Sequence, residues 1–186
     1  VALDAVEHQQ RQLGKRINFS ILYGLTPYGL SKDLGISFKD AKKYIEKYFA
    51  QYPGVSSWME RVITFAKEHG YVKTVWGRRR YIPAIHERNR TLYEEACRMA
   101  VNTVAQGTAA DIMKKGMLTL GAAFKRDGIP AQILLQIHDE LVVSVAASHV
   151  VQAEVLVRQV LESVVDWPVP LQVTTRSGAD WREITK

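Results

Sequence analysis

Hydrophobic positions recur at helical spacing over roughly the first 70 residues, and the pattern is mixed after that. Apolar periodicity and capping signals predict four helices, over residues 11–23, 27–35, 38–52 and 55–70. Thr26 and Ser37 are the expected N-caps, since each precedes an apolar-periodic run. The stripe formed by Phe38, Ala41 and its neighbours every three to four residues is expected to be core.

Later residues alternate between strand-like and helical patterns. A short β-ribbon is predicted over 71–76 and 81–85, with Gly77-Arg78-Arg79-Arg80 as a basic turn. A long helix follows over 92–124, then two apolar β-branched runs over 132–137 and 141–145. Because one strand would be about twice the typical length of 5 to 6 residues, these runs predict a hairpin. We also expect a helix capped by Ser148 and ending near 165, and a strand over 171–175. The fold class is therefore α+β.

Composition narrows the class of protein. The 186 residues, 47% of them hydrophobic, suffice for one domain or part of a larger one, and the net charge of +6 favours polyanionic partners such as nucleic acid. The single cysteine, Cys97, excludes a disulfide scaffold and a cysteine-based metal site, so a soluble intracellular chain is expected. No apolar run approaches the roughly 20 residues that span a bilayer, and the start looks cut from a longer chain.

The first predicted helix carries Arg11, Lys15, Phe19 and Tyr23, which recur every fourth residue. Each lies about 40° around the helix from the one before, so all four share one face. Two cations suit a triphosphate, and two rings suit a sugar and a base. The alternative is an amphipathic helix whose cations are solvated and whose rings belong to the core.

A second polar row consists of Arg98, Asn102 and Gln106, followed by the small residues 107–110. Guanidinium and amide groups at this spacing can line a groove and bind minor-groove base edges or the sugar-phosphate chain. A polar outer face on a long helix explains the row equally well.

His138-Asp139-Glu140 interrupts two hydrophobic runs. Adjacent carboxylates repel each other unless a cation or solvent compensates them, and Mg²⁺ prefers such oxygen ligands. The alternative is an ordinary charged turn, although the usual Asn-Gly or Asp-Gly residues are missing.

The run Arg78-Arg79-Arg80 is either a phosphate-contacting patch or a solvated face.

Together these residues resemble the fingers and palm of family A DNA polymerases, of the bacterial DNA polymerase I type. The resemblance covers the whole chain and follows four ordered segments: Arg11-Gln-Leu-Gly-Lys15-Arg-Ile-Asn-Phe19-Ser-Ile-Leu-Tyr23-Gly24 (motif B), Gly77-Arg-Arg-Arg-Tyr81-Ile-Pro, Gln106-Gly-Thr-Ala-Ala-Asp111, and Gln136-Ile-His138-Asp139-Glu140-Leu (motif C). It implies a fingers-like helical segment over residues 1–85 and a palm portion with an antiparallel sheet over 86–186.

The resemblance also implies residue roles. Arg11 and Lys15 would hold the dNTP phosphates, with Lys15 as general acid toward pyrophosphate. Phe19 would stack near the sugar and base, and in this family a Phe there disfavours dideoxynucleotides. Tyr23 would occupy the template-base position until the fingers close. Gly24, Arg98, Asn102 and Gln106 would contact primer-template DNA. His138 would lie near the primer end, and Asp139 with Glu140 would bind metal.

Some positions depart from the family pattern. Tyr93, Cys97 and Val104 stand where members commonly have Arg, Glu and Pro. Motif A, with the other essential aspartate, has no match here and is expected upstream. Two-metal phosphoryl transfer with Mg²⁺ needs both aspartates, so Asp139 with Glu140 is half of a site, and we expect the isolated chain to be inactive.

The sequence therefore predicts part of a DNA-directed DNA polymerase that adds dNTPs to a primer 3′-OH. Its expected partners are primer-template DNA, dNTP and upstream polymerase segments, with no membrane; the complete protein is expected to be a cytoplasmic, nucleoid-associated monomer. One alternative is a single-subunit RNA polymerase-like fragment, which the Gln-Gly-Thr-Ala-Ala-Asp run and His-Asp-Glu disfavour. Another is a non-catalytic nucleic-acid-binding module that relies on charge alone. We expect the cationic and aromatic side chains of the first helix to point across a common cleft toward the acidic hairpin turn.

Overall fold

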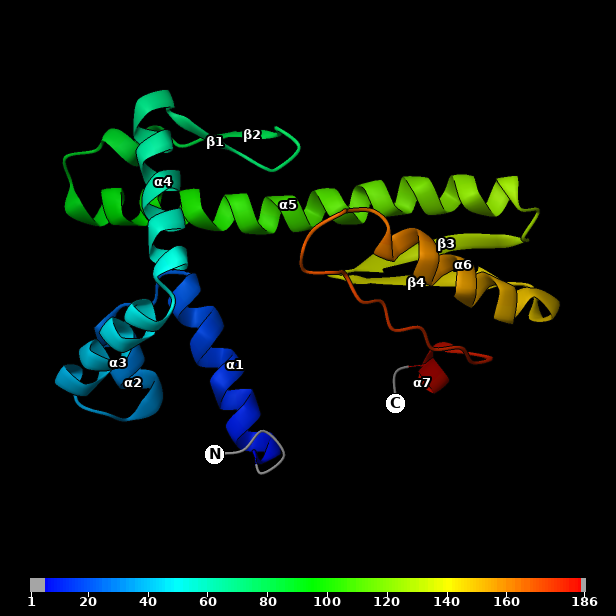
Figure 1. Cartoon of the computed structure of the whole chain (residues 1–186), viewed down its shortest axis with the longest axis horizontal. Helices are drawn as coiled ribbons and strands as arrows, with labels where there is room; N and C mark the ends of the chain where they lie inside the picture. Colours follow the sequence, from blue (N-terminus) through cyan, green and yellow to red (C-terminus); the bar gives the residue numbers. More distant parts are fainter. Residues whose placement is uncertain (1–5, 185–186) are drawn as a thin grey trace. The chain divides into compact units, whose positions relative to one another are not determined.

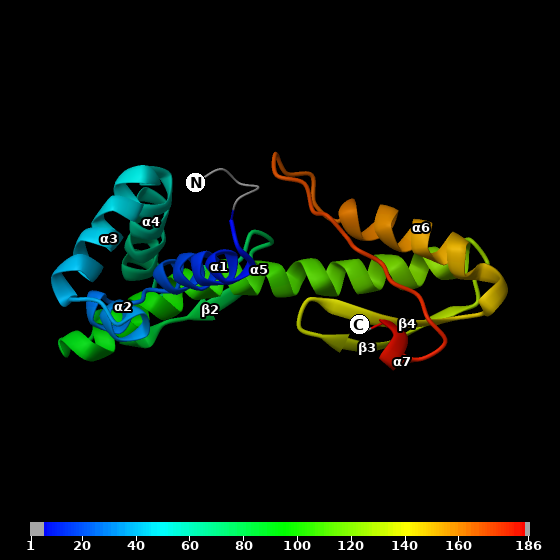
Figure 2. The same ribbon diagram turned by 90° about the horizontal axis from the view of Figure 1, so that it is seen from below.

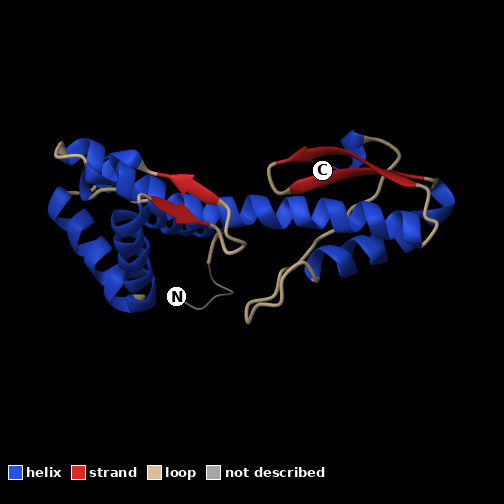
Figure 3. Ribbon diagram, turned by 90° about the horizontal axis from the view of Figure 1, so that it is seen from above, coloured by secondary structure: helices blue, strands red, loops and turns tan. Residues whose placement is uncertain are grey.

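The computed structural model describes residues 6–184. The chain forms two compact units, Val1–Gly107 and Thr108–Lys186, and their boundary lies inside one long helix (Figure 1). Most described residues are helical, and the strands form antiparallel pairs (Figure 3). The predicted α+β class is confirmed. The division into a fingers-like segment over 1–85 and a palm portion over 86–186 concerns function and stays a prediction.

The first unit begins with four helices that end close to where the sequence predicts: α1 (His8–Leu22), α2 (Pro27–Leu34), α3 (Phe38–Gln51) and α4 (Pro53–His69). The Thr26 hydroxyl oxygen accepts a hydrogen bond from the Gly29 amide at 3.2 Å and caps α2. The Ser37 hydroxyl oxygen accepts one from the Asp40 amide at 3.1 Å and caps α3. Each cap satisfies an amide that the helix itself leaves unpaired, so both predicted N-caps are confirmed.

These helices share a small hydrophobic core. Ile17 and Ile21 of α1 pack in one cluster with Leu30 of α2 and Ala41 of α3, and Figure 2 shows how α2, α3 and α4 follow one another in this unit. Phe38, by contrast, is 56% exposed, so its predicted place in the core is wrong. It is the first residue of α3 and lies outside the buried cluster.

A β-ribbon follows α4, with β1 (Tyr71–Lys73) antiparallel to β2 (Arg79–Tyr81). The predicted ribbon is confirmed, but its second strand lies earlier than residues 81–85. Pro83 begins a 3₁₀ turn, η2 (Pro83–His86), because proline has no amide hydrogen for a strand ladder. The ribbon packs in a second core cluster with α4 and α5 (Arg90–Arg126), a helix that confirms the predicted long helix.

The second unit contains the end of α5, the hairpin β3 (Ala131–Ile137) and β4 (Glu140–Val145), and α6 (Val150–Glu162). The hairpin confirms the prediction. Inward-facing side chains of both strands pack with α5 and α6 around Leu120, Phe124 and Leu156. No helix among residues 6–184 is long and apolar enough to cross a membrane.

Two predictions in this unit are wrong. Ser148 lies in a 3₁₀ turn, η3 (Ala147–His149), and its hydroxyl contacts the adjacent His149 ring at 2.9 Å instead of capping α6. Residues 171–175 form no strand, because no described strand pairs with them; the Val173 amide donates to the Glu162 carboxylate at 2.9 Å. The short helix α7 (Trp181–Ile184) was not predicted.

Two glycines give a matched test of the backbone. Gly14 lies inside α1, Gly35 ends α2 with φ +64°, and a Cβ at either position would meet no atom within 4 Å. We expect Gly14→Ala to raise the free energy of unfolding by about 0.5 to 1 kcal/mol. Gly35→Ala should lower it by about 1 kcal/mol, because its backbone is left-handed. Urea unfolding followed by circular dichroism measures both, and changes of the same sign would contradict the described conformations.

Candidate functional site

Helix α1 exposes to solvent the face that carries its predicted nucleotide-binding residues, here called the α1 face. Arg11, Lys15, Phe19 and Tyr23 are all exposed. The buried residues Ile17 and Ile21 lie about 160° to 200° around the helix from Phe19, at about 100° per residue. The rings of Phe19 and Tyr23 are nearly parallel, with an interplanar angle of 14° and centroids 6.4 Å apart. The rings are 56% and 40% exposed, so the alternative that they belong to the core is excluded.

The two cations of this face are available for an anion. Within residues 6–184, no carboxylate forms an ion pair with Arg11 or Lys15. Exposed cations without protein partners keep their charge for a ligand and lose little solvation when a phosphate approaches. The α1 face therefore has the chemistry that a nucleotide triphosphate requires.

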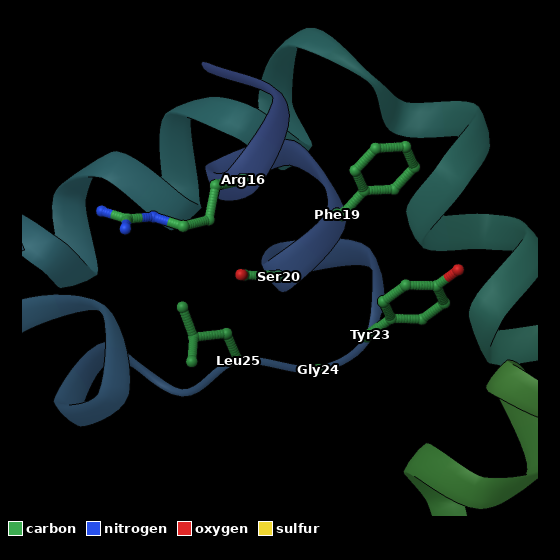
Figure 4. A pocket seen from close by; sticks show the side chains of 6 residues that line it. All are labelled: Arg16, Phe19, Ser20, Tyr23, Gly24 and Leu25. Carbon is green, nitrogen blue, oxygen red and sulfur yellow. The ribbon is translucent and has the colours of Figure 1, made fainter. Parts of the chain in front are cut away.

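An open hollow borders the rings, lined by Arg16, Phe19, Ser20, Tyr23, Gly24 and Leu25 (Figure 4). Phe19 and Tyr23 project toward the same side, whereas Arg16 extends along the other side of the hollow. Reasoning from sequence missed Arg16, because only the every-fourth-residue row was considered. Its position three residues before Phe19 would have placed it near that row.

The end of α1 lies directly on α5 within the first unit. Gly24 has φ +83°, and a Cβ there would lie 2.6 Å from Cγ and 2.8 Å from Cδ of Arg98. The structure therefore brings Gly24 beside Arg98, the first residue of the predicted polar row. Along α5, the Asn102 Oδ1 atom is buried without a hydrogen-bond partner among the described residues, and Gln106 is exposed.

The hairpin of the second unit closes with a two-residue turn, since Ile137 pairs with Glu140. His138 has φ +53° and is the sole described residue other than glycine with a positive φ. Tight hairpin turns require such a backbone, and a residue with a side chain pays about 1 to 2 kcal/mol for it. The Gln136 side-chain Nε2 donates to the His138 backbone carbonyl at 3.1 Å and stabilises the turn.

Asp139 and Glu140 are exposed at this turn. Neither carboxylate has a hydrogen bond or ion pair with the residues that the structure describes. Two adjacent carboxylates are the oxygen ligands that Mg²⁺ prefers, so the residues fit one side of a magnesium site. Within the described part of the chain, no three His, Cys, Asp or Glu side chains are grouped to hold a metal. A magnesium site at this turn would need further ligands.

The α1 face and the hairpin turn belong to different units, and their predicted convergence on a common cleft stays a prediction. Taken separately, one is a surface suited to nucleotides and the other a surface suited to a divalent cation. These are features of enzymes that act on nucleotides. The chain belongs to DNA polymerase family A, whose family model matches residues 1–183.

Similar proteins include DNA polymerase I of Pseudomonas aeruginosa, 42% identical over 98% of this chain and 20% of that protein. The thermostable DNA polymerase I of Thermus filiformis is 43% identical over 96% of this chain and 21% of its own length. A solved structure of the POL domain of Pol1 from M. smegmatis, in complex with DNA primer-template and dNTP, matches with a TM-score of 0.96 and 38% identity. That match covers all of this chain and 33% of the solved chain. The chain thus spans about a fifth of the length of these curated relatives.

The contact between Gly24 and Arg98 can be tested by adding one methyl group. Gly24→Ala should lower the free energy of unfolding by more than Gly35→Ala does, because both have a left-handed backbone but only Gly24 also meets Arg98. We expect an additional loss of about 1 to 3 kcal/mol, measured by urea unfolding. Equal losses in the two variants would show that Arg98 does not rest on Gly24.

Proposed function

We propose that this chain forms the fingers and part of the palm of a DNA-directed DNA polymerase, which adds dNTPs to a primer 3′-OH and releases pyrophosphate. The observation that carries the proposal is the exposure of Arg11, Lys15, Phe19 and Tyr23 on the side of α1 opposite its buried isoleucines. Membership of DNA polymerase family A supports it. So do relatives named DNA polymerase I and a similar structure that holds primer-template and dNTP.

On the nucleotide side, the exposed cations Arg11 and Lys15 bind the triphosphate. The primer 3′-hydroxyl gives its proton to solvent water as its oxygen attacks the α-phosphorus, and the bond from that phosphorus to the oxygen that bridges to the β-phosphorus breaks. Lys15 Nζ donates a proton to the departing pyrophosphate, which limits the charge that develops there. Phe19 stacks near the sugar and base, and Tyr23 with Gly24 holds the template-base position.

On the DNA side, Arg98, Asn102 and Gln106 contact primer-template DNA from one face of α5. The strained His138 backbone at the hairpin turn supports a functional position near the primer end.

Asp139 and Glu140 would hold magnesium, Asp139 as the principal ligand and Glu140 in support. Bound Mg²⁺ would supply charge stabilisation for the attacking and leaving oxygens. A further aspartate comes from polypeptide outside these 186 residues. We propose that the complete enzyme is a cytoplasmic monomer. Its similarity to the bacterial proteins described above supports this proposal.

The metal role of Asp139 can be tested in a graft that replaces the matching segment of the Pseudomonas aeruginosa enzyme. The graft should extend a primer, and Asp139→Ala should reduce extension about a thousandfold or more, because a metal ligand supplies several kcal/mol of transition-state stabilisation. Binding of primer-template should persist. Asp166→Ala, which removes another exposed carboxylate of the second unit, serves as the control and should retain activity.

A folded but inactive graft, or an Asp139→Ala graft that remains active, would contradict the proposal. The isolated 186-residue chain should not extend primers, since its described residues provide no group of three metal ligands. Preference for rNTPs over dNTPs in the graft would indicate an RNA polymerase instead.

The placement of Phe19 is tested by chain terminators. In the active graft, Phe19→Tyr should ease dideoxynucleotide incorporation by about tenfold, because the added hydroxyl replaces a hydrogen bond of the missing 3′-OH. The ratio of kcat/KM for dNTP and ddNTP measures this effect. Phe38→Tyr is a matched control, because Phe38 is also 56% exposed and lies on α3. An unchanged ratio for Phe19→Tyr would refute this placement.

A further inference from the structure

The β1–β2 ribbon has two chemically different faces. Successive strand residues point to opposite sides, and the register pairs Tyr71 with Tyr81, Val72 with Arg80, and Lys73 with Arg79. On the inner side, Val72 is buried and the Arg80 guanidinium donates to the Thr103 hydroxyl of α5 at 3.2 Å. The other side carries the remaining residues of the register. We call this outer side the ribbon face: Tyr71, Lys73, Arg79 and Tyr81.

The rings of the ribbon face continue onto α4 as a connected series. The Tyr81 and Tyr71 centroids are 5.8 Å apart, and Tyr71 lies 5.6 Å from Phe65 of α4. Phe65 stacks on His69 at 4.1 Å with an interplanar angle of 12°. Tyr81 ends this series and is 69% exposed, so much of its ring remains open to solvent. The inner rings hold the platform in place, and Tyr81 offers the free surface.

Two cations lie among these rings. The Arg79 guanidinium is 4.6 Å from the Tyr71 ring centroid, and Lys73 Nζ is 5.5 Å from that of Phe65. Both side chains are exposed, and no carboxylate in the described part of the chain pairs with either. The nearest acidic contact of the series is Glu68, 3.9 Å from His69 Nδ1, at the end opposite Tyr81. The cations are therefore ordered by the rings and remain positively charged toward solvent.

A purely structural role explains this arrangement poorly. The core beneath the ribbon is already filled by Val72, Ile82 and Ala66, each at most 1% exposed. Tyr81 covers little of that core, given its exposure. Two exposed cations beside an open ring do not add to core packing, but they match a ligand that combines a flat ring with negative charge.

We propose that the ribbon face binds an unpaired DNA strand, with a base stacked on Tyr81 and its phosphates held by Lys73 and Arg79. An unpaired strand fits better than a duplex, because only an unpaired base can place its ring face on an exposed aromatic side chain. The choice of DNA rests on the proposed function. The ribbon face consists of other residues than the α1 face and the hairpin turn, so it adds a further contact for nucleic acid.

Fluorescence anisotropy with labelled oligo(dT) tests the proposal on the full 186-residue chain, without dNTP or Mg²⁺. Tyr81→Leu should weaken binding about tenfold, since stacking on one aromatic ring contributes about 1 to 3 kcal/mol per base. Tyr81→Phe should bind like the original chain. Tyr44→Leu, which removes an exposed ring from α3, is the matched control and should have little effect. Equal affinities for Tyr81→Leu and Tyr44→Leu would overturn the proposal.

The salt dependence tests the cations separately. The double variant Lys73→Gln/Arg79→Gln should reduce the slope of log K against log salt by about 1.4, at about 0.7 per phosphate contact on a single strand. Lys39→Gln/Lys43→Gln removes the same charge from exposed positions of α3 and should change the slope less. Equal changes in slope would mean that net charge alone binds the strand.

Photocrosslinking locates the strand directly. An oligonucleotide with 5-iodouracil should crosslink to the peptide that contains Tyr81, as identified by mass spectrometry. Crosslinks confined to other peptides, or stronger effects of the variants on duplex or oligo(rU) than on oligo(dT), would overturn the proposal. Because none of these measurements includes nucleotide addition, a failure here is distinguishable from a failure of the proposed polymerase function.

Discussion

The packing of Ile17 and Ile21 against α2 and α3 determines what α1 can present to solvent. A helix that buries one side must expose the opposite side, and here the residues opposite the isoleucines are two cations and two aromatic rings. Rings as large as Phe19 and Tyr23 would normally be favoured as core. Their exposure follows from the register of the isoleucines, so two buried aliphatic side chains fix which way the α1 face with Arg11, Lys15, Phe19 and Tyr23 points.

The same constraint acts with a different period in the strands. In the β1–β2 ribbon, burial of Val72 forces Tyr71 and Lys73 outward, because strand side chains alternate. In the β3–β4 hairpin, Ile133 and Val143 lie opposite each other and pack toward α5 and α6. Each of these elements has one side on the core and one side on the solvent. A few apolar positions therefore determine both which residues are buried and which are exposed.

Local interactions explain which features could be predicted from the sequence. Thr26 and Ser37 cap helices through bonds that span three residues, and Gly35 takes the left-handed backbone that its position demands. Helix caps and left-handed glycines depend only on residues close in the sequence, so the sequence alone could predict them. Residues 171–175 have strand-like composition, but a strand needs a partner that composition does not reveal. The site shows the same division: the four-residue spacing identified the α1 face, whereas the contact of Gly24 with Arg98 joins segments 74 residues apart.

The hairpin turn shows how a distant requirement can override local preference. The sequence lacks the glycine or asparagine that tight turns favour, yet the pairing of Ile137 with Glu140 forces a positive φ on His138. The strand ladder and the bond from Gln136 therefore hold Asp139 in place, and no contact of its own carboxylate does so. Within residues 6–184, the two adjacent carboxylates have no hydrogen bond or ion pair. Solvent or a bound cation can compensate their charges, and carboxylates held on a closed turn lose less conformational entropy when a cation binds than carboxylates on an unfolded chain.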